Sequence, residues 1–144
     1  MLIGEYIHSL DDKNRVSLPA KFRKELGKKL VVTRGLEHSL FVYSLPEWKK
    51  ISEKLSELGM GASGTRGFNR FLLAGAVEAD VDSAGRILVP DFLKKFAGLK
   101  GKVVMAGVGS RVEVWDEKAW TAYKSQIERE ADALAERLGG VGAL

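Results

Sequence analysis

An internal repeat is the feature that most constrains how this chain can fold. Two segments, residues 11–19 and 82–90, share the pattern D-x-x-[NG]-R-[VI]-x-[LV]-P. With one residue inserted, the similarity continues beyond each segment and pairs Val31 and Val32 with Val103 and Val104, Gly35 with Gly107, Val42 with Val114, Tyr43 with Trp115, and Trp48 with Trp120. A single repetition of this kind predicts two copies of one small unit.

Each copy predicts a small alternation of short strands with a short helix. Valine pairs in both copies, and the alternation of valine with charged residues over 111–114, indicate strands. Pro19 and Pro90 each suit a first helical position, and Gly27 and Gly98 suit helix ends. These signals predict short helices over residues 20–26 and 91–97.

A longer helix is expected after each copy. Residues 44–47 form a capping-box pattern before a helix over 47–58, and a second long helix is expected over 117–138. Their apolar residues recur at spacings of three and four: Trp48, Ile51, Leu55 and Leu58 in the first, and Trp120, Tyr123, Ile127, Ala131, Leu134 and Leu138 in the second. These stripes fit either an intrachain core or contacts between subunits.

The glycine-rich segment 59–67 is expected to be a flexible joint. Gly59, Gly61 and Gly64 satisfy G-x-G-x-x-G, but they follow a predicted helix and not a strand, so we expect no dinucleotide site. A short amphipathic helix should follow, with Phe68, Phe71, Leu72 and Gly75 marking its course and Arg66 and Arg70 on its polar side. The expected organisation is a first repeat over 5–47, the helix and joint over 48–75, a second repeat over 76–119, and a C-terminal helix over 120–144.

The D-x-x-[NG]-R loops carry the residues of greatest functional interest. Asparagine and glycine tolerate a left-handed backbone, so Asn14 and Gly85 can close a tight turn. Asp11 and Asp82 can accept backbone N–H groups in that turn, which leaves Arg15 and Arg86 at the tip, within reach of their aspartates. Each Asp–Arg pair can be a structural staple or part of a binding site.

The first loop is richer in cations than the second, within a chain of net charge +4. Basic residues outnumber acids over 11–29, whereas acids predominate over 113–138. Lys13 lies in the first loop, and Lys21, Arg23 and Lys24 follow it as a supporting basic patch. Lysine suits phosphate contacts, and arginine and asparagine can bind guanine and adenine edges. This pattern favours nucleic acid, although it also fits a solvated face.

Other functional classes find little support. The chain has no cysteine, which excludes disulfides and thiolate chemistry. His8 and His38 lack the spacing of a zinc site, and an arginine beside each repeated aspartate would keep that carboxyl ionised and unsuited to acid–base catalysis. We therefore expect neither an enzyme nor a cofactor or metal. With no signal-peptide pattern or membrane-length apolar run, a cytoplasmic location is expected.

The motifs resemble those of the MraZ family over nearly the whole chain: two D-x-x-x-R loops, LPEW at residues 45–48 and VWDEKAW at 114–120. The resemblance implies an α+β fold of two tandem SpoVT-AbrB-like repeats of the swapped-hairpin type, related by a pseudo-twofold axis. It also implies a ring-shaped homo-oligomer, associated with the nucleoid, that binds direct repeats in double-stranded promoter DNA and regulates the division and cell-wall gene cluster, including its own gene. On that basis Lys13, Asn14, Arg15 and Arg86 would contact DNA, and Asp11, Asp82 and Gly85 would organise the loops.

An alternative remains open from the residues alone. The acidic, amphipathic C-terminal helix fits a protein-interaction module, either antitoxin-like or docking on an enzyme. Such a role is compatible with DNA binding.

Overall fold

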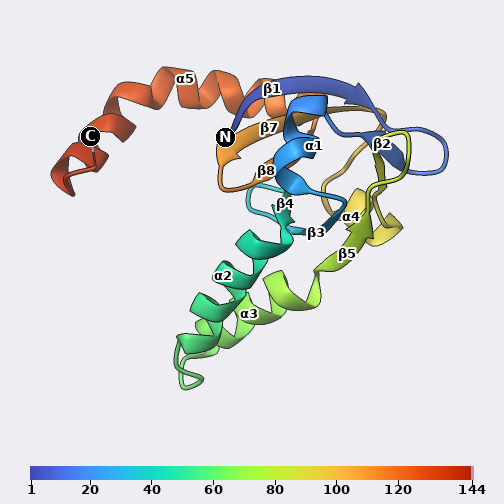
Figure 1. Ribbon diagram of the computed structural model, residues 1–144. Helices are drawn as coiled ribbons and strands as arrows, with labels where there is room; N and C mark the ends of the chain where they lie inside the picture. Colours follow the sequence, from blue (N-terminus) through green and yellow to red (C-terminus); the bar gives the residue numbers. More distant parts are fainter. Residues whose placement is uncertain (144) are drawn as a thin grey trace.

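The computed structural model describes residues 1–143, and Figure 1 shows a β-rich body from which two helical arms extend. The strands are β1 (Leu2–Ser9), β2 (Arg15–Ser17), β3 (Lys29–Arg34), β4 (Leu40–Ser44), β5 (Val77–Asp80), β6 (Arg86–Leu88), β7 (Lys102–Gly109) and β8 (Val112–Asp116). The helices are α1 (Ala20–Leu26), α2 (Leu45–Glu57), α3 (Ser63–Ala74), α4 (Asp91–Phe96) and α5 (Glu117–Gly140). This is the expected α+β class.

The main sheet interleaves strands of both repeats in the order β1-β7-β8-β4-β3-β5. β1 of the first repeat pairs with β7 of the second, β5 of the second repeat pairs with β3 of the first, and β4 pairs with β8 at the centre. β2 and β6 form a separate antiparallel ribbon, hereafter the β2–β6 ribbon. Each repeat thus completes the sheet of the other, which confirms the swapped-hairpin arrangement.

The strand register shows the pseudo-twofold axis directly. In the ribbon Val16 lies opposite Ile87, and these two residues occupy the same position of the repeated motif. Their neighbours pair reciprocally, Arg15 with Leu88 and Ser17 with Arg86. An axis of this kind, passing between Val16 and Ile87, relates the two repeats as it would relate the subunits of a symmetric dimer.

One detail of the sequence alignment of the two copies is wrong. Lys29 pairs with Asp80 and Lys102 pairs with Ser9, so Lys29 is the structural equivalent of Lys102. Leu30 and not Val31 therefore corresponds to Val103. The connection between α4 and β7 is longer than that between α1 and β3, and this extra length shifts β7 by one more residue. The match of Val42 with Val114 holds, because Leu40 pairs with Val114 and Val42 with Val112.

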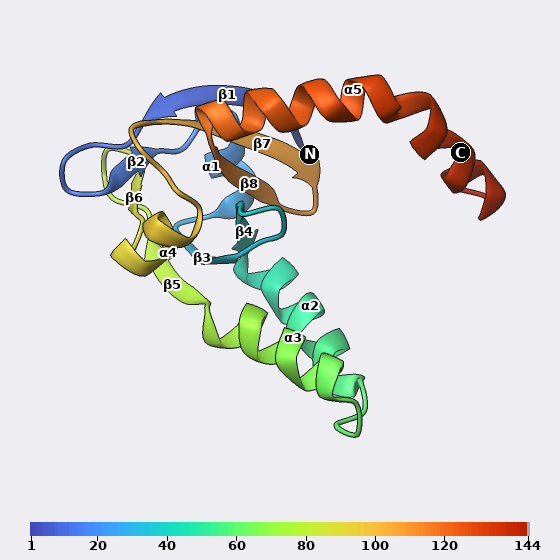
Figure 2. The ribbon, with the colours of Figure 1, turned by 180° about the vertical axis from the view of Figure 1, so that it is seen from behind.

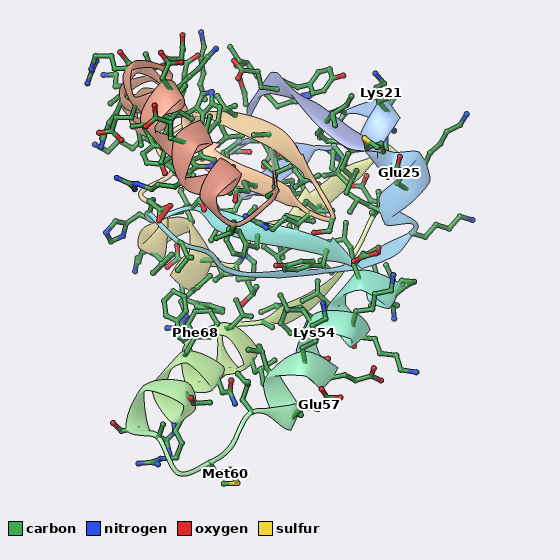
Figure 3. The ribbon with its side chains drawn as sticks, turned by 90° about the vertical axis from the view of Figure 1, so that its left-hand side faces the viewer. Lys21, Glu25, Lys54, Glu57, Met60 and Phe68 are labelled. Carbon is green, nitrogen blue, oxygen red and sulfur yellow. The ribbon has the colours of Figure 1, made fainter. Side chains whose placement is uncertain are left out.

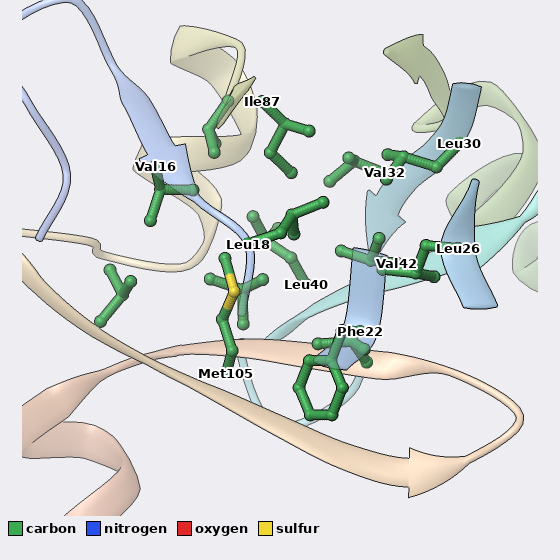
Figure 4. Packing of buried hydrophobic residues seen from close by; sticks show 14 of the residues in the cluster. Val16, Leu18, Phe22, Leu26, Leu30, Val32, Leu40, Val42, Ile87 and Met105 are labelled. Carbon is green, nitrogen blue, oxygen red and sulfur yellow. The ribbon is translucent and has the colours of Figure 1, made fainter. Parts of the chain in front are cut away.

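The main core lies between the six-stranded sheet and a layer made of the ribbon, α1 and α4. Figure 4 shows Val16, Ile87 and Phe22 of that layer packed over Val42 and Met105 of the sheet. All five side chains are buried, and burial of one such side chain contributes about 1.5–3 kcal/mol. The ribbon is therefore anchored by apolar contacts on its inner face, which leaves its outer face free.

The opposite face of the sheet is covered by the longer helices. Phe41 and Tyr43 of β4 pack with Leu55 of α2 and Leu72 of α3. Trp115 of β8 stacks on Tyr123 of α5 at 5.0 Å and contacts Trp120 at 5.3 Å between ring centroids. Ser44 accepts a hydrogen bond from the backbone of Glu47 at 3.3 Å, which confirms the predicted helix start.

The helical arm formed by α2 and α3 corrects the prediction of a flexible joint. α3 begins at Ser63, within the glycine-rich segment, and Figure 3 places Met60 at the tip of the arm. One bond ties α3 to α2, in which Asn69 Nδ2 donates to the carbonyl of Leu55 at 3.4 Å. A second bond closes the turn between the helices, in which Arg66 Nη1 donates to the carbonyl of Met60 at 2.7 Å. These contacts and the packing of Leu72 outweigh the low helix propensity of glycine.

α5 forms the second arm, and only its first half lies on the sheet (Figures 1 and 2). Leu134 and Leu138 in its second half are 36% and 48% exposed. The apolar stripe of α5 is thus intrachain core at its start and uncovered towards its end. Across residues 1–143, no helix combines the length and the hydropathy that a membrane crossing requires.

Candidate nucleic-acid interface

The β2–β6 ribbon presents four side chains on its outer face. Successive residues of a strand point to opposite sides, and Val16 and Ile87 point into the core. Arg15 and Leu88 lie opposite each other on the outer side, as do Ser17 and Arg86. The two arginines therefore occupy diagonal corners of a small exposed face, and Leu88 beside them is 55% exposed.

The first loop is closed by hydrogen bonds to Asp11. Its Oδ1 accepts the backbone N–H groups of Lys13 at 2.9 Å and Arg15 at 2.8 Å, and its Oδ2 accepts Arg15 Nε at 3.0 Å. Asn14 adopts the left-handed backbone, with φ of 61°. This is the turn geometry that the loop residues predict. Because Nε is engaged, the Arg15 fork is oriented with its two Nη groups available.

The second loop repeats this geometry almost atom for atom. Asp82 Oδ1 accepts the backbone N–H groups of Ala84 and Arg86, each at 2.9 Å, and Oδ2 accepts Arg86 Nε at 2.9 Å. Gly85 has φ of 79°. The second loop, although poorer in cations, is therefore as well formed as the first.

Hydrogen bonding keeps both loop carboxylates ionised. The backbone N–H of Arg15 is the largest cause that lowers the pKa of Asp11, and the N–H of Arg86 has the same effect on the pKa of Asp82. In each case the arginine side chain lowers the pKa further. Both Asp–Arg pairs thus stay intact at neutral pH.

The two loops are also bonded to each other's repeat. The backbone N–H of Leu18 donates to the carbonyl of Gly85 at 2.9 Å, and that of Val89 donates to the carbonyl of Asn14 at 2.8 Å. Lys94 Nζ of α4 donates to Asn14 Oδ1 at 3.1 Å. One chain therefore holds both loops in a fixed relative position.

The basic patch lies beside the second loop and not the first. Arg23 and Lys24 of α1 line a hollow together with Asp82 and Gly85. A side chain at position 85 would collide with the Arg23 guanidinium, so this glycine leaves room for a cation from the other repeat. Lys21 lies on the exposed side of α1 (Figure 3), and Lys13 is exposed in the first loop.

Three residues of this surface were missed by sequence reasoning. Ser17 and Leu88 could have been found, because they lie two residues beyond the arginines on strands with a buried middle residue. Lys94 carries no comparable signal, since its contact with Asn14 links residues far apart in sequence. Neither histidine belongs to the ribbon, since His8 is in β1 and His38 is in the turn before β4. Within residues 1–143, no group of three or more metal-ligating side chains is found.

The chain is similar to a known family along most of its length. The family model described as "MraZ protein, putative antitoxin-like" matches residues 1–71 and 72–140. "Transcriptional regulator MraZ" of Caldanaerobacter subterraneus subsp. tengcongensis is 49% identical over 138 residues, which cover 96% of each chain. The proteins of the same name from Oenococcus oeni and Acetivibrio thermocellus are 48% and 45% identical, over 96% and 99% of each chain. Both halves match one family model, and the chain belongs to the MraZ family.

Proposed function

We propose that this protein is a sequence-specific, DNA-binding transcriptional regulator that reads base edges with the outer face of the β2–β6 ribbon. The observation that carries this proposal is the diagonal pair Arg15 and Arg86, each held by its own aspartate through Nε. The major groove of B-DNA admits a two-stranded ribbon, and the arginine fork matches O6 and N7 of guanine. A pre-oriented fork loses less side-chain freedom on binding.

The exposed cations around the ribbon suit the phosphate backbone. Lys13 lies at the tip of the first loop, and Arg23 and Lys24 lie beside the second. Phosphate contacts fix the orientation of a protein on the duplex and supply salt-dependent affinity. We therefore assign Arg15 and Arg86 to base recognition, and Lys13, Arg23 and Lys24 to phosphate contact.

The target that we propose is a set of direct repeats in promoter DNA upstream of the protein's own gene and of the division and cell-wall cluster. This target is what the family resemblance implies; the names of the relatives support the broader role of transcriptional regulator. It would place the protein in the cytoplasm, at the nucleoid.

A ring-shaped homo-oligomer is part of the proposal, because one ribbon is a small surface for specific binding. Single DNA-binding modules bury about 600–1,000 Å², and linked sites gain affinity when their spacing matches that of the DNA repeats. The uncovered stripe of α5, with Leu134 and Leu138, offers a surface for subunit contact. The double variant L134Q L138Q should lower the mass measured by light scattering and leave the melting temperature within a few degrees.

The same stripe favours a second candidate function, a protein-interaction module. Acidic residues flank it: Glu128, Glu130, Asp132 and Glu136. If L134Q L138Q keeps both the wild-type mass and the wild-type affinity for DNA, the stripe would serve another protein and not a second copy.

The deciding experiment is a binding titration of the purified protein with DNA from upstream of its own gene, beside a shuffled duplex, at two salt concentrations. We expect tight, salt-dependent binding to the upstream DNA alone. Arg15→Ala should abolish this preference. Lys54→Ala changes a residue of α2, which extends away from β2 (Figure 1), and should bind as the wild type does. Equal binding to both duplexes would refute sequence-specific regulation.

A further inference from the structure

The amide of Asn14 is fixed in one orientation by a lysine of the other repeat. Lys94 Nζ donates to Asn14 Oδ1 at 3.1 Å. The backbone of Asn14 is fixed as well, since its N–H donates to the Asp11 carbonyl at 3.0 Å and its carbonyl accepts from Val89 at 2.8 Å. Both residues are half-buried. The side chain therefore has little freedom to turn while this bond is made.

The bond determines which polar group of Asn14 faces outward. An ammonium group has three donors and no acceptor, so only the amide oxygen can face Lys94, and Nδ2 must point elsewhere. A free asparagine offers one donor and one acceptor, which match N7 and N6 of adenine. Lys94 takes up one of the two lone pairs of Oδ1, and this arrangement adds the remaining ammonium protons to the Nδ2 donors, so that donors predominate beside the loop. Such a set of donors suits two acceptors side by side, as guanine presents with O6 and N7.

The second repeat does not reproduce this arrangement. Gly85 has no side chain at the equivalent point, and the Arg23 guanidinium occupies the space. The repeats therefore present an oriented amide on one side and a guanidinium on the other. This difference gives a pseudosymmetric ribbon a direction along the duplex.

We propose that Asn14 and Lys94 act as one specificity-determining unit, which selects guanine over adenine at the base pair facing the first loop. The proposal rests on the DNA-binding function proposed above. It makes Lys94 a positioning residue for Asn14, whose amide makes the contact with the base.

The test uses the full-length protein and a panel of upstream duplexes in which each base pair is replaced in turn. For the wild type, one guanine-to-adenine replacement should weaken binding about tenfold or more, the size of one good bidentate contact. Lys94→Met keeps the length of the side chain without its donors and should reduce that penalty at least fivefold. Lys95→Met, on the same helix, removes an equal charge paired with Asp91 and should leave the penalty unchanged.

A second variant tests the same inference with a substitution that the loop backbone tolerates. Asn14→Gly copies the residue of the second loop, so the positive φ is retained, and it should abolish the same single-base penalty. Adding Lys94→Met to Asn14→Gly should then change base preference no further, as expected for two residues acting as one unit.

Two outcomes would overturn the inference alone. One is a Lys94→Met variant that binds every duplex more weakly by the same factor, as loss of a phosphate contact would cause. The other is an Asn14→Gly variant with wild-type base preferences. If the wild type itself failed to distinguish upstream from shuffled DNA, the proposed function would fall and this inference with it.

Discussion

Replacing Arg15 with lysine would keep the charge of the first loop and remove the geometry on which the proposed base contact depends. The Arg15 side chain is 32% exposed and its Nε is bonded to Asp11 at 3.0 Å. Lysine has a single donor group at the end of a flexible chain, so it cannot bind Asp11 and present a planar fork at the same time.

The expected size of the effect follows from the groups that are lost. A bidentate arginine–guanine contact contributes about 1–3 kcal/mol of discrimination, which corresponds to a loss of about 5- to 150-fold in preference for the upstream DNA. The dependence of affinity on salt should stay as in the wild type, because the charge is retained. Lys13→Ala should show the converse, with a salt slope reduced by about 0.9 and an unchanged preference.

Fluorescence anisotropy titrations at several salt concentrations, with upstream and shuffled duplexes, separate these two effects. A melting curve of each variant establishes that it is folded. The reasoning would be refuted if folded Arg15→Lys kept the wild-type preference, or if its salt slope fell as that of Lys13→Ala does.

Three further predictions concern the fold that supports the ribbon. Folding lowers the pKa values of Asp11 and Asp82. The stability that these two carboxylates contribute is therefore present above the unfolded pKa of about 4 and is lost as the pH falls below it. Between pH 5 and 2.5, the melting temperature of D11N D82N should fall less steeply with pH than that of the wild type. Ile87→Ala empties a fully buried position under the ribbon and should lower the free energy of unfolding in urea by about 2–5 kcal/mol, whereas a change under 1 kcal/mol would contradict the packing. In a fragment of residues 1–75, β1 lacks its partner β7 and β3 lacks its partner β5. Sedimentation should therefore show a homodimer, in which the strands of a second copy replace the missing partners, and a folded monomer would contradict the swapped arrangement.

Local chemistry explains which features could be predicted from the sequence. α1 begins and ends where Pro19 and Gly27 predict, and the loop of Asp11 and Asn14 closes as its residues require. These features depend on residues within a few positions of each other. α3 was missed in part because its glycines are helical only through packing against α2 and the sheet, which no local pattern reports.

The composition of the candidate site depends on long-range pairing. The swap carries Arg23 of the first repeat to the second loop and Lys94 of the second repeat to the first loop. Proximity in the sequence would assign Arg23 to the first loop and Lys94 to the second, which is the reverse of what the structure shows. The family resemblance supplied the pseudo-twofold pairing, but only the strand register shows Ser17 opposite Arg86 and Leu88 opposite Arg15.

Both repeats should contribute to one DNA-reading surface, and an amide NMR titration with the upstream duplex is the direct test. We expect the shifts to concentrate at residues 11–17 and 82–88 and to extend to α1, with the α2–α3 arm unaffected. Shifts confined to the first loop would show that the second repeat only supports it, and shifts centred on the arm or on α5 would contradict the assignment of the ribbon as the interface.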